Sequence, residues 1–146
     1  MRPATYLCIV PIIAATAVFA HSGVKDPTVM ARMQNMGTIG ENMKVIGQMM
    51  KKEIPFDAVA AQVAAGNIAA AASLTVAKFE DPATDPKSEA LPAIWEDFAD
   101  FSTKASDLET VARTQAGTIG SYDDLRGAAG ALAGACKACH SRYKAD

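Results

Sequence analysis

Apolar residues recur at steps of three and four along four stretches of this chain, which is the periodicity of amphipathic helices. The first stretch opens at Asp26-Pro27, where Asp suits the N-cap and Pro suits the first helical position. It fades near Lys51-Lys52, and Pro55 marks the turn that follows. The apolar positions that predict this first helix are Val29, Met33, Met36, Ile39, Met43, Ile46 and Met50.

The second and third predicted helices are separated by a proline-containing loop. Asp57 is the expected cap of the second helix, an alanine-rich stretch of high helix propensity that carries Val59, Val63, Ile68, Leu74 and Val76. Residues 79–92 contain three prolines and several charges, so we expect a loop there, the longest connection. The third helix is predicted from Pro92 to Ala116, with inward positions at Ile94, Trp95, Phe98, Phe101, Leu108 and Val111.

The fourth helix follows Gly117 and Gly120, which end the third. Ser121 and Asp124 resemble a capping box in which Asp replaces the usual Glu or Gln, and the helix is expected to continue to about Lys144. Alternating β-branched patterns are absent from the sequence. We therefore predict an all-α fold, an antiparallel up-down-up-down four-helix bundle, which builds cofactor sites between facing helices.

The first twenty residues predict a signal peptide. Arg2 supplies the positive charge, an apolar stretch follows, and Val18-Phe19-Ala20 offers small residues for cleavage after Ala20. The domains expected are thus a signal peptide over 1–20 and one bundle over 21–146, located in the periplasm. The apolar run is too short for a membrane-spanning helix, so we expect no stable membrane insertion.

Composition adds little beyond exclusions. The full chain holds 14 basic and 16 acidic residues, and removal of Arg2 with the leader leaves 13 against 16. A mildly acidic, mixed charge distribution gives no basic face for nucleic acid, and no basic amphipathic segment suggests a membrane surface.

Candidate chemistry is concentrated in the last predicted helix, at Cys136-Lys137-Ala138-Cys139-His140. Cys-x-x-Cys-His is the attachment motif of c-type haem, in which both thiols add to the porphyrin vinyl groups and the imidazole binds iron. On a helix these three side chains leave from one face. We therefore predict one covalent haem c on the C-terminal helix.

The cysteine pair has two other interpretations. A redox disulfide is expected near a βαβ pattern, which this sequence lacks. A structural zinc site needs four ligands, and the other candidates are Cys8, which lies in the leader, and His21, which stands alone. Covalent haem is the favoured interpretation.

A haem motif on the last helix of a four-helix bundle resembles the class II cytochromes c, that is, cytochrome c′ and its low-spin relatives. The resemblance covers essentially the whole mature chain. The C-terminal motif is its most specific part, and weaker support comes from Arg32 four residues before Met36, Gly40-Glu41-Asn42-Met43, Pro55-Phe56-Asp57, Pro92-Ala93-Ile94-Trp95 and Tyr143-Lys144.

The resemblance assigns roles to several residues. It implies that Cys136 and Cys139 form the thioethers and that His140 is the proximal iron ligand. Lys144 matches a basic residue near the exposed edge of the imidazole, where its charge is expected to influence the reduction potential. Arg32 matches an arginine that interacts with a haem propionate, with a solvated helix residue as the alternative. Trp95 is expected to pack against the haem or the core.

The same resemblance places Met36 at the distal position, facing the iron from the side opposite His140. Ligation by its thioether would make the protein a low-spin electron carrier, and Gly37 and Gly40 would let the helix backbone approach the porphyrin. The first helix holds six methionines, so packing is the alternative for each one, and Met33 is the next candidate ligand.

The function predicted from sequence is therefore single-electron transfer in the periplasm, to and from redox partner proteins, rather than an enzymatic reaction. The alternative is a five-coordinate, high-spin cytochrome c′ that binds nitric oxide or carbon monoxide. Peroxidase chemistry usually requires a base on the distal side of the haem, and no His follows Met36 on the first predicted helix, so a peroxidase is not predicted. The alanine-rich second helix also permits a homodimer, and the oligomeric state stays open.

Overall fold

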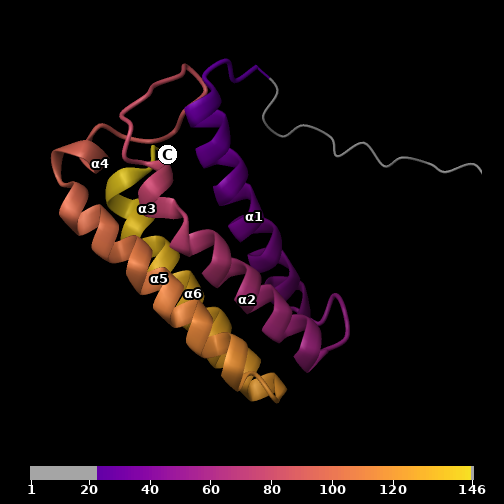
Figure 1. Cartoon of the computed structure of the whole chain (residues 1–146). Helices are drawn as coiled ribbons and strands as arrows, with labels where there is room; N and C mark the ends of the chain where they lie inside the picture. The colour runs from indigo at the N-terminus through magenta and orange to yellow at the C-terminus, as the bar shows by residue number, and fades with distance from the viewer. Residues whose placement is uncertain (1–22, 146) are drawn as a thin grey trace, which may run out of the picture.

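The computed structural model describes residues 23–145 of the chain, and the expected leader with its cleavage point lies outside this range. Within it the helices are α1 (Pro27–Met50), α2 (Ala58–Ser73), α3 (Thr75–Lys78), α4 (Ala93–Glu96), α5 (Phe98–Thr118) and α6 (Tyr122–Tyr143). Four long helices run alternately up and down (Figure 1), and α1 contacts α2 and α6 while α5 contacts the same two helices. The predicted four-helix bundle is confirmed.

Side-chain caps begin the helices where the sequence predicted them. The Asp26 carboxylate accepts hydrogen bonds from the amides of Thr28 and Val29, both at 2.9 Å, and Asp57 accepts one from Ala60 at 3.0 Å. Ser121 Oγ accepts a bond from the Asp124 amide at 3.2 Å. These acceptors satisfy amides that have no partner inside the helix, and so they fix where α1, α2 and α6 start.

The predicted third helix is divided in two. Asp97 has backbone angles of φ −137° and ψ 60°, which lie outside the helical region, and it separates α4 from α5. Its carboxylate accepts a hydrogen bond from the Asp100 amide at 3.3 Å and so caps the new helix. The prediction of one continuous helix from Pro92 was wrong at this residue, and α5 also extends beyond Ala116 to Thr118.

The second helix uses alanine rather than its larger residues to contact the bundle. Ile68 is buried, but Val59 and Val63 are 69% and 56% exposed, and Leu74 is 52% exposed. The buried face consists instead of Ala61, Ala64, Ala65, Ala69, Ala71 and Ala72. Small side chains let α2 approach its neighbours closely; a Cβ added to Gly66 would lie 4.0 Å from the Cβ of Ala116 in α5.

Two hydrophobic clusters form the interior. The larger cluster joins the helices along most of the bundle and includes Ile46, Ile68, Leu125 and Leu132. The smaller one consists of Phe79, Ile94, Phe101 and Tyr143, at the end where α5 begins and α6 ends. Met36 of α1 packs against both clusters, so it lies where the two meet.

Candidate haem site

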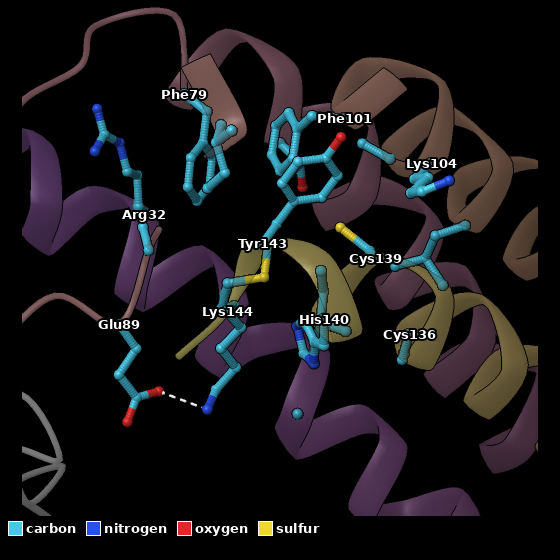
Figure 2. A pocket seen from close by; sticks show the side chains of 18 of the residues that line it. Arg32, Phe79, Glu89, Phe101, Lys104, Cys136, Cys139, His140, Tyr143 and Lys144 are labelled. Atoms are coloured by element: carbon cyan, nitrogen blue, oxygen red, sulfur yellow. Dashed lines mark ion pairs between the residues drawn. The ribbon is translucent and has the colours of Figure 1, made fainter. Parts of the chain in front are cut away.

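A cavity of about 620 Å³ lies beside the smaller cluster, and its walls are largely apolar. α1 between Val29 and Met43, the first half of α5, the second half of α6 and part of the loop between α3 and α4 all contribute side chains. These segments are far apart in the sequence and meet at one end of the bundle (Figures 1 and 2). The bundle therefore provides an apolar space of the kind that ligand and cofactor sites require.

The three chemical groups of the motif line this cavity together. Cys136, Cys139 and His140 all project from α6 (Figure 2), while Lys137 and Ala138 between them are exposed. Both cysteines are free thiols and are partly buried. The prediction that the helical spacing gathers these groups on one face is confirmed.

The surroundings favour the neutral forms of all three groups. Burial raises the pKa of the Cys136 and Cys139 thiols. Burial also lowers the pKa of His140, the charge of Lys144 lowers it further, and Glu89 acts in the opposite direction. A neutral imidazole has a free nitrogen lone pair, which is the form that binds a metal.

The first helix forms another wall and presents thioethers to the cavity. Met33, Met36 and Met43 all line it, together with Gly37 and Gly40. A Cβ placed on Gly40 would meet no atom within 4 Å, so this part of α1 faces open space. Met36 and Met33, the two candidate ligands from the sequence, are thus both available at the same wall.

Arg32 is 2% exposed and holds the loop that follows α3. Its Nε and Nη1 donate hydrogen bonds to the carbonyl oxygens of Lys78 and Ala83, each at 2.9 Å. Its guanidinium carbon also lies 5.0 Å and 5.1 Å from the ring centroids of Phe79 and Trp95. The remaining nitrogen, Nη2, is buried without a hydrogen-bond partner. Arg32 therefore keeps one spare donor, and burial lowers its pKa.

Trp95 belongs to the small cluster and is not among the residues that line the cavity. Its indole Nε1 donates a 2.8 Å hydrogen bond to the carbonyl oxygen of Phe79. This position matches the core packing expected from the sequence, and direct contact with a cofactor stays a prediction.

The end of α6 is joined to the loop before α4. The amide of Leu91 donates to the carbonyl of Tyr143 at 3.0 Å, and the amide of Ala145 donates to the carbonyl of Glu89 at 2.8 Å. The Glu89 carboxylate also forms an ion pair with Lys144 at 2.9 Å (Figure 2). We call the two backbone bonds the loop–terminus pairing. Sequence reasoning missed Glu89, because nothing in its local pattern signals a partner 55 residues away.

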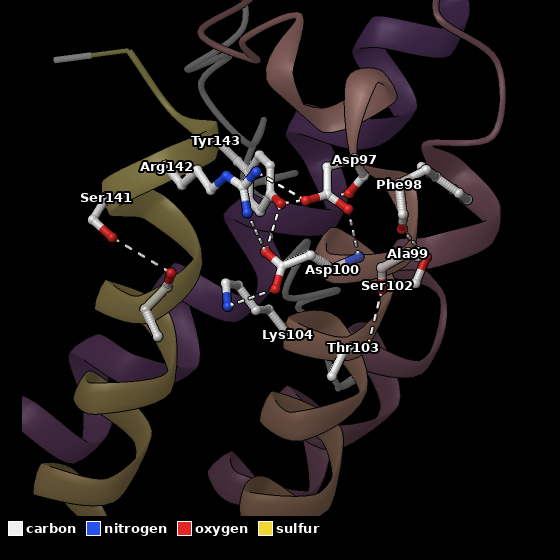
Figure 3. A network of polar contacts seen from close by, with 11 residues as sticks. Asp97, Phe98, Ala99, Asp100, Ser102, Thr103, Lys104, Ser141, Arg142 and Tyr143 are labelled. Atoms are coloured by element: carbon white, nitrogen blue, oxygen red, sulfur yellow. Dashed lines mark hydrogen bonds and ion pairs between the residues drawn. The ribbon is translucent and has the colours of Figure 1, made fainter.

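A second polar network fixes the last turn of α6 onto the start of α5 (Figure 3). Tyr143, which is buried, donates its hydroxyl to Asp100 at 2.6 Å. Arg142 pairs with Asp100 at 3.0 Å and with Asp97 at 2.8 Å, and Lys104 pairs with Asp100 at 3.2 Å. The hydrogen bond from Tyr143 and then that from Lys104 lower the pKa of Asp100. This network holds Cys139 and His140 in place by anchoring the turn that follows them.

The arrangement suits a haem in three respects. Two thiols and an imidazole face one apolar cavity from a single helix. Gly40 leaves room beside the opposite helix, where a side chain would otherwise project. Arg32 lines the cavity and carries a positive charge, which suits a negatively charged group such as a propionate.

Comparison with known families decides which class of haem protein this is. The family model described as Cytochrome C′ matches residues 27–144, the whole of the bundle. The chain belongs to the cytochrome c′ family. Members carry haem c attached through the Cys-x-x-Cys-His motif, and this chain is therefore a c-type cytochrome, an electron-transport protein with one covalent haem at Cys136 and Cys139.

Individual relatives within the family are similar to this chain in sequence and in structure. Cytochrome c-554 of Cereibacter sphaeroides is 33% identical in an alignment that covers 99% of this chain and 98% of that protein. Cytochrome c-556 of Rhodopseudomonas palustris is 28% identical, with 91% and 90% covered. The structure of cytochrome c′ from Rhodopseudomonas palustris gives a TM-score of 0.78 at 32% identity, covering 84% of this chain and 98% of that one.

Two further properties concern the described range only. Between residues 23 and 145, no helix is long and apolar enough to cross a bilayer. In the same range, no three His, Cys, Asp or Glu side chains are grouped so that they could hold a metal ion.

Proposed function

We propose that this cytochrome carries single electrons in the periplasm, with His140 and Met36 as the axial ligands of a six-coordinate iron. The observation that carries the proposal is that α6 and α1 bring an imidazole and a thioether to the same cavity. The cofactor supplies an iron that gains or loses one electron, and a His/Met ligand pair raises its potential. The relatives named cytochrome c-554 and c-556 support placing this chain among carriers rather than enzymes.

The residues of the chain have distinct parts in this proposal. Cys136 and Cys139 hold the cofactor to α6, and the neutral imidazole of His140 binds from the same helix. Arg32, which lines the cavity, pairs its positive charge with a propionate. The apolar walls exclude water, so that little solvent rearranges when the charge of the site changes. The proposed partners are other periplasmic redox proteins, reached after export and cleavage behind Ala20.

The competing function is a five-coordinate cytochrome that binds nitric oxide or carbon monoxide. Relatives named cytochrome c′, such as the Rhodopseudomonas palustris protein at 35% identity, keep this candidate in view. The two functions differ in whether sulfur occupies the sixth position.

The absorption spectrum of the purified protein distinguishes the two functions. We expect sharp ferrous α and β bands and a sulfur-to-iron charge-transfer band at the red end of the ferric spectrum. Met36→Ala should abolish that band and give a broad high-spin spectrum that responds at once to carbon monoxide. Met33→Ala and Met43→Ala are matched controls, because both residues line the same wall, and they should leave the band unchanged.

Other results would contradict the assignment in defined ways. A high-spin spectrum in the unmodified protein would replace the carrier with the gas-binding function. Loss of the band in Met33→Ala instead of Met36→Ala would move the ligand by one turn of α1.

A further inference from the structure

Glu89 lies at the cavity on the side of the proximal ligand. Its carboxylate is 2.9 Å from the ammonium group of Lys144, and both residues line the cavity together with His140. The two charges act on the His140 imidazole in opposite directions. The negative charge of Glu89 therefore offsets, at the His140 imidazole, the positive charge of Lys144, the basic residue that the sequence predicted near this ligand.

The backbone determines the position of Glu89. The loop–terminus pairing consists of two backbone hydrogen bonds. In one, the carbonyl oxygen of Glu89 accepts the Ala145 amide at 2.8 Å, and in the other, the Leu91 amide donates to the Tyr143 carbonyl at 3.0 Å. Ala90 and Lys144 form an antiparallel bridge between these two bonds. Because none of these bonds involves the carboxylate, replacing the carboxylate by an amide leaves the segment in place.

We infer that Glu89 is a positioning residue that sets the reduction potential: its carboxylate offsets the charge of Lys144 beside the iron ligand and so keeps the potential lower than Lys144 alone would set it. The oxidised site carries one more positive charge than the reduced site, so a nearby anion favours oxidation and a nearby cation favours reduction. The inference rests on His140 as a ligand and not on the identity of the sixth ligand.

Both side chains are partly exposed, at 62% for Glu89 and 41% for Lys144, so water and salt screen their charges. The expected shift is therefore modest, and it should shrink as ionic strength rises. A shift caused by altered packing would not depend on salt in this way.

The test is the reduction potential of the intact holoprotein, measured by spectroelectrochemical titration at low ionic strength. Glu89→Gln should move the potential in the positive direction, because Lys144 loses its counter-charge. Lys144→Gln should move it in the negative direction, because Glu89 is left alone. The double variant should fall between the two single variants. Glu53→Gln is the matched control: Glu53 pairs with Lys51 at 3.9 Å in the turn before α2, and its loss should not move the potential.

The signs of the shifts separate charge from structure. If Glu89 and Lys144 only hold the end of α6 in place, both single variants should shift the potential in the same direction, which would overturn the inference. No shift in Glu89→Gln at low salt would overturn it too. Protected Leu91 and Ala145 amides in hydrogen exchange would show that the loop–terminus pairing survives the substitution, as the inference requires.

Failure of the proposed function would look different from failure of this inference. The absorption spectrum of each variant reports the sixth ligand independently of the potential. A high-spin spectrum with opposite shifts in the two single variants would reject Met36 as a ligand and retain Glu89 as the counter-charge.

Discussion

Tyr143 lines the cavity, and its hydroxyl group bonds to a partly exposed aspartate on a neighbouring helix. Its ring is buried and packs edge-on against Phe101 at 5.5 Å, while the hydroxyl donates to Asp100 at 2.6 Å. Burial first, and then the bond to Asp100, raise the pKa of Tyr143 to about 12. The folded protein thus favours the neutral phenol, because a phenolate would be poorly solvated and would face a carboxylate.

The raised pKa predicts an alkaline loss of stability. The stabilisation from Tyr143 is fully present below about pH 10, the pKa of an unfolded tyrosine, and is lost as pH rises towards about 12. Tyr143→Phe should lower the melting temperature at pH 7, where the hydrogen bond is lost, and should flatten the decline between pH 10 and 12. Thermal unfolding followed by circular dichroism measures both effects.

Tyr122→Phe is the control for that experiment. Tyr122 donates its hydroxyl to the carbonyl of Met50 at 2.5 Å, at the other end of the bundle. This variant also removes a single hydroxyl group and its hydrogen bond, so its melting temperature at pH 7 shows what such a loss costs away from the cavity. An unchanged decline in Tyr143→Phe would show that Tyr143 is not the group responsible.

The sequence predicted some of these residues and not others for a clear physical reason. Cys136, Cys139 and His140 lie within one turn and a half of a helix, so their common face follows from helical geometry alone. Tyr143, in contrast, is buried because Asp100 and Phe101 come to it from another helix. Long-range partners of this kind leave no trace in local spacing.

At the scale of the element, α2 shows how close packing depends on small side chains. Ala64 and Ala65 are buried in the larger cluster, whereas Ala70 on the same helix is exposed. Helix propensity is the same at all three positions, since the residue is the same. The positions differ only in the room that the neighbouring helices leave.

This difference predicts opposite tolerance to one substitution. Ala65→Leu forces extra volume into a packed interface and should cost about 1–3 kcal/mol in the free energy of unfolding. Ala70→Leu adds the same atoms on the exposed face and should change that free energy by less than about 0.5 kcal/mol. Urea denaturation of the two variants provides the comparison. Equal losses would show that the α2 interface has spare room at Ala65.

Element boundaries were predictable where a single residue signals them. Asp26 and Asp57 stand directly before helical stretches, and both cap helices as expected. The break at Asp97 was not foreseen, because the residues on both sides of it favour helix. It is stabilised by Arg142, which reaches Asp97 from α6 at 2.8 Å and so supports a local geometry that the sequence around Asp97 does not reveal.

At the scale of the whole molecule, the two hydrophobic clusters differ in how their apolar surface is covered. The larger cluster is built from side chains packed against one another along the bundle. The smaller one borders a cavity of about 620 Å³ with apolar walls. Covering these walls with the cofactor removes apolar surface from water and stabilises the fold.

Removing the attachment should therefore weaken the fold. The double variant Cys136→Ser with Cys139→Ser should lack the covalent haem in mass spectrometry. We expect it to lose at least about 3 kcal/mol in the free energy of unfolding, the scale of burying one large apolar side chain. Ala138→Ser is the matched control, because it changes an exposed position inside the motif and leaves both thiols. Equal stability of the double variant and the wild type would show that the cofactor does not support the bundle.

The position of the thiols on α6 also sets an order of events during synthesis. Translation proceeds from the N-terminus, so α1, α2 and α5 have been synthesised before Cys136 is made. The larger cluster draws most of its buried residues from these earlier helices, so much of the hydrophobic surface exists before the cofactor can be attached. The nascent polypeptide must therefore stay unfolded until α6 has been synthesised, or its incomplete bundle must admit the porphyrin at one end.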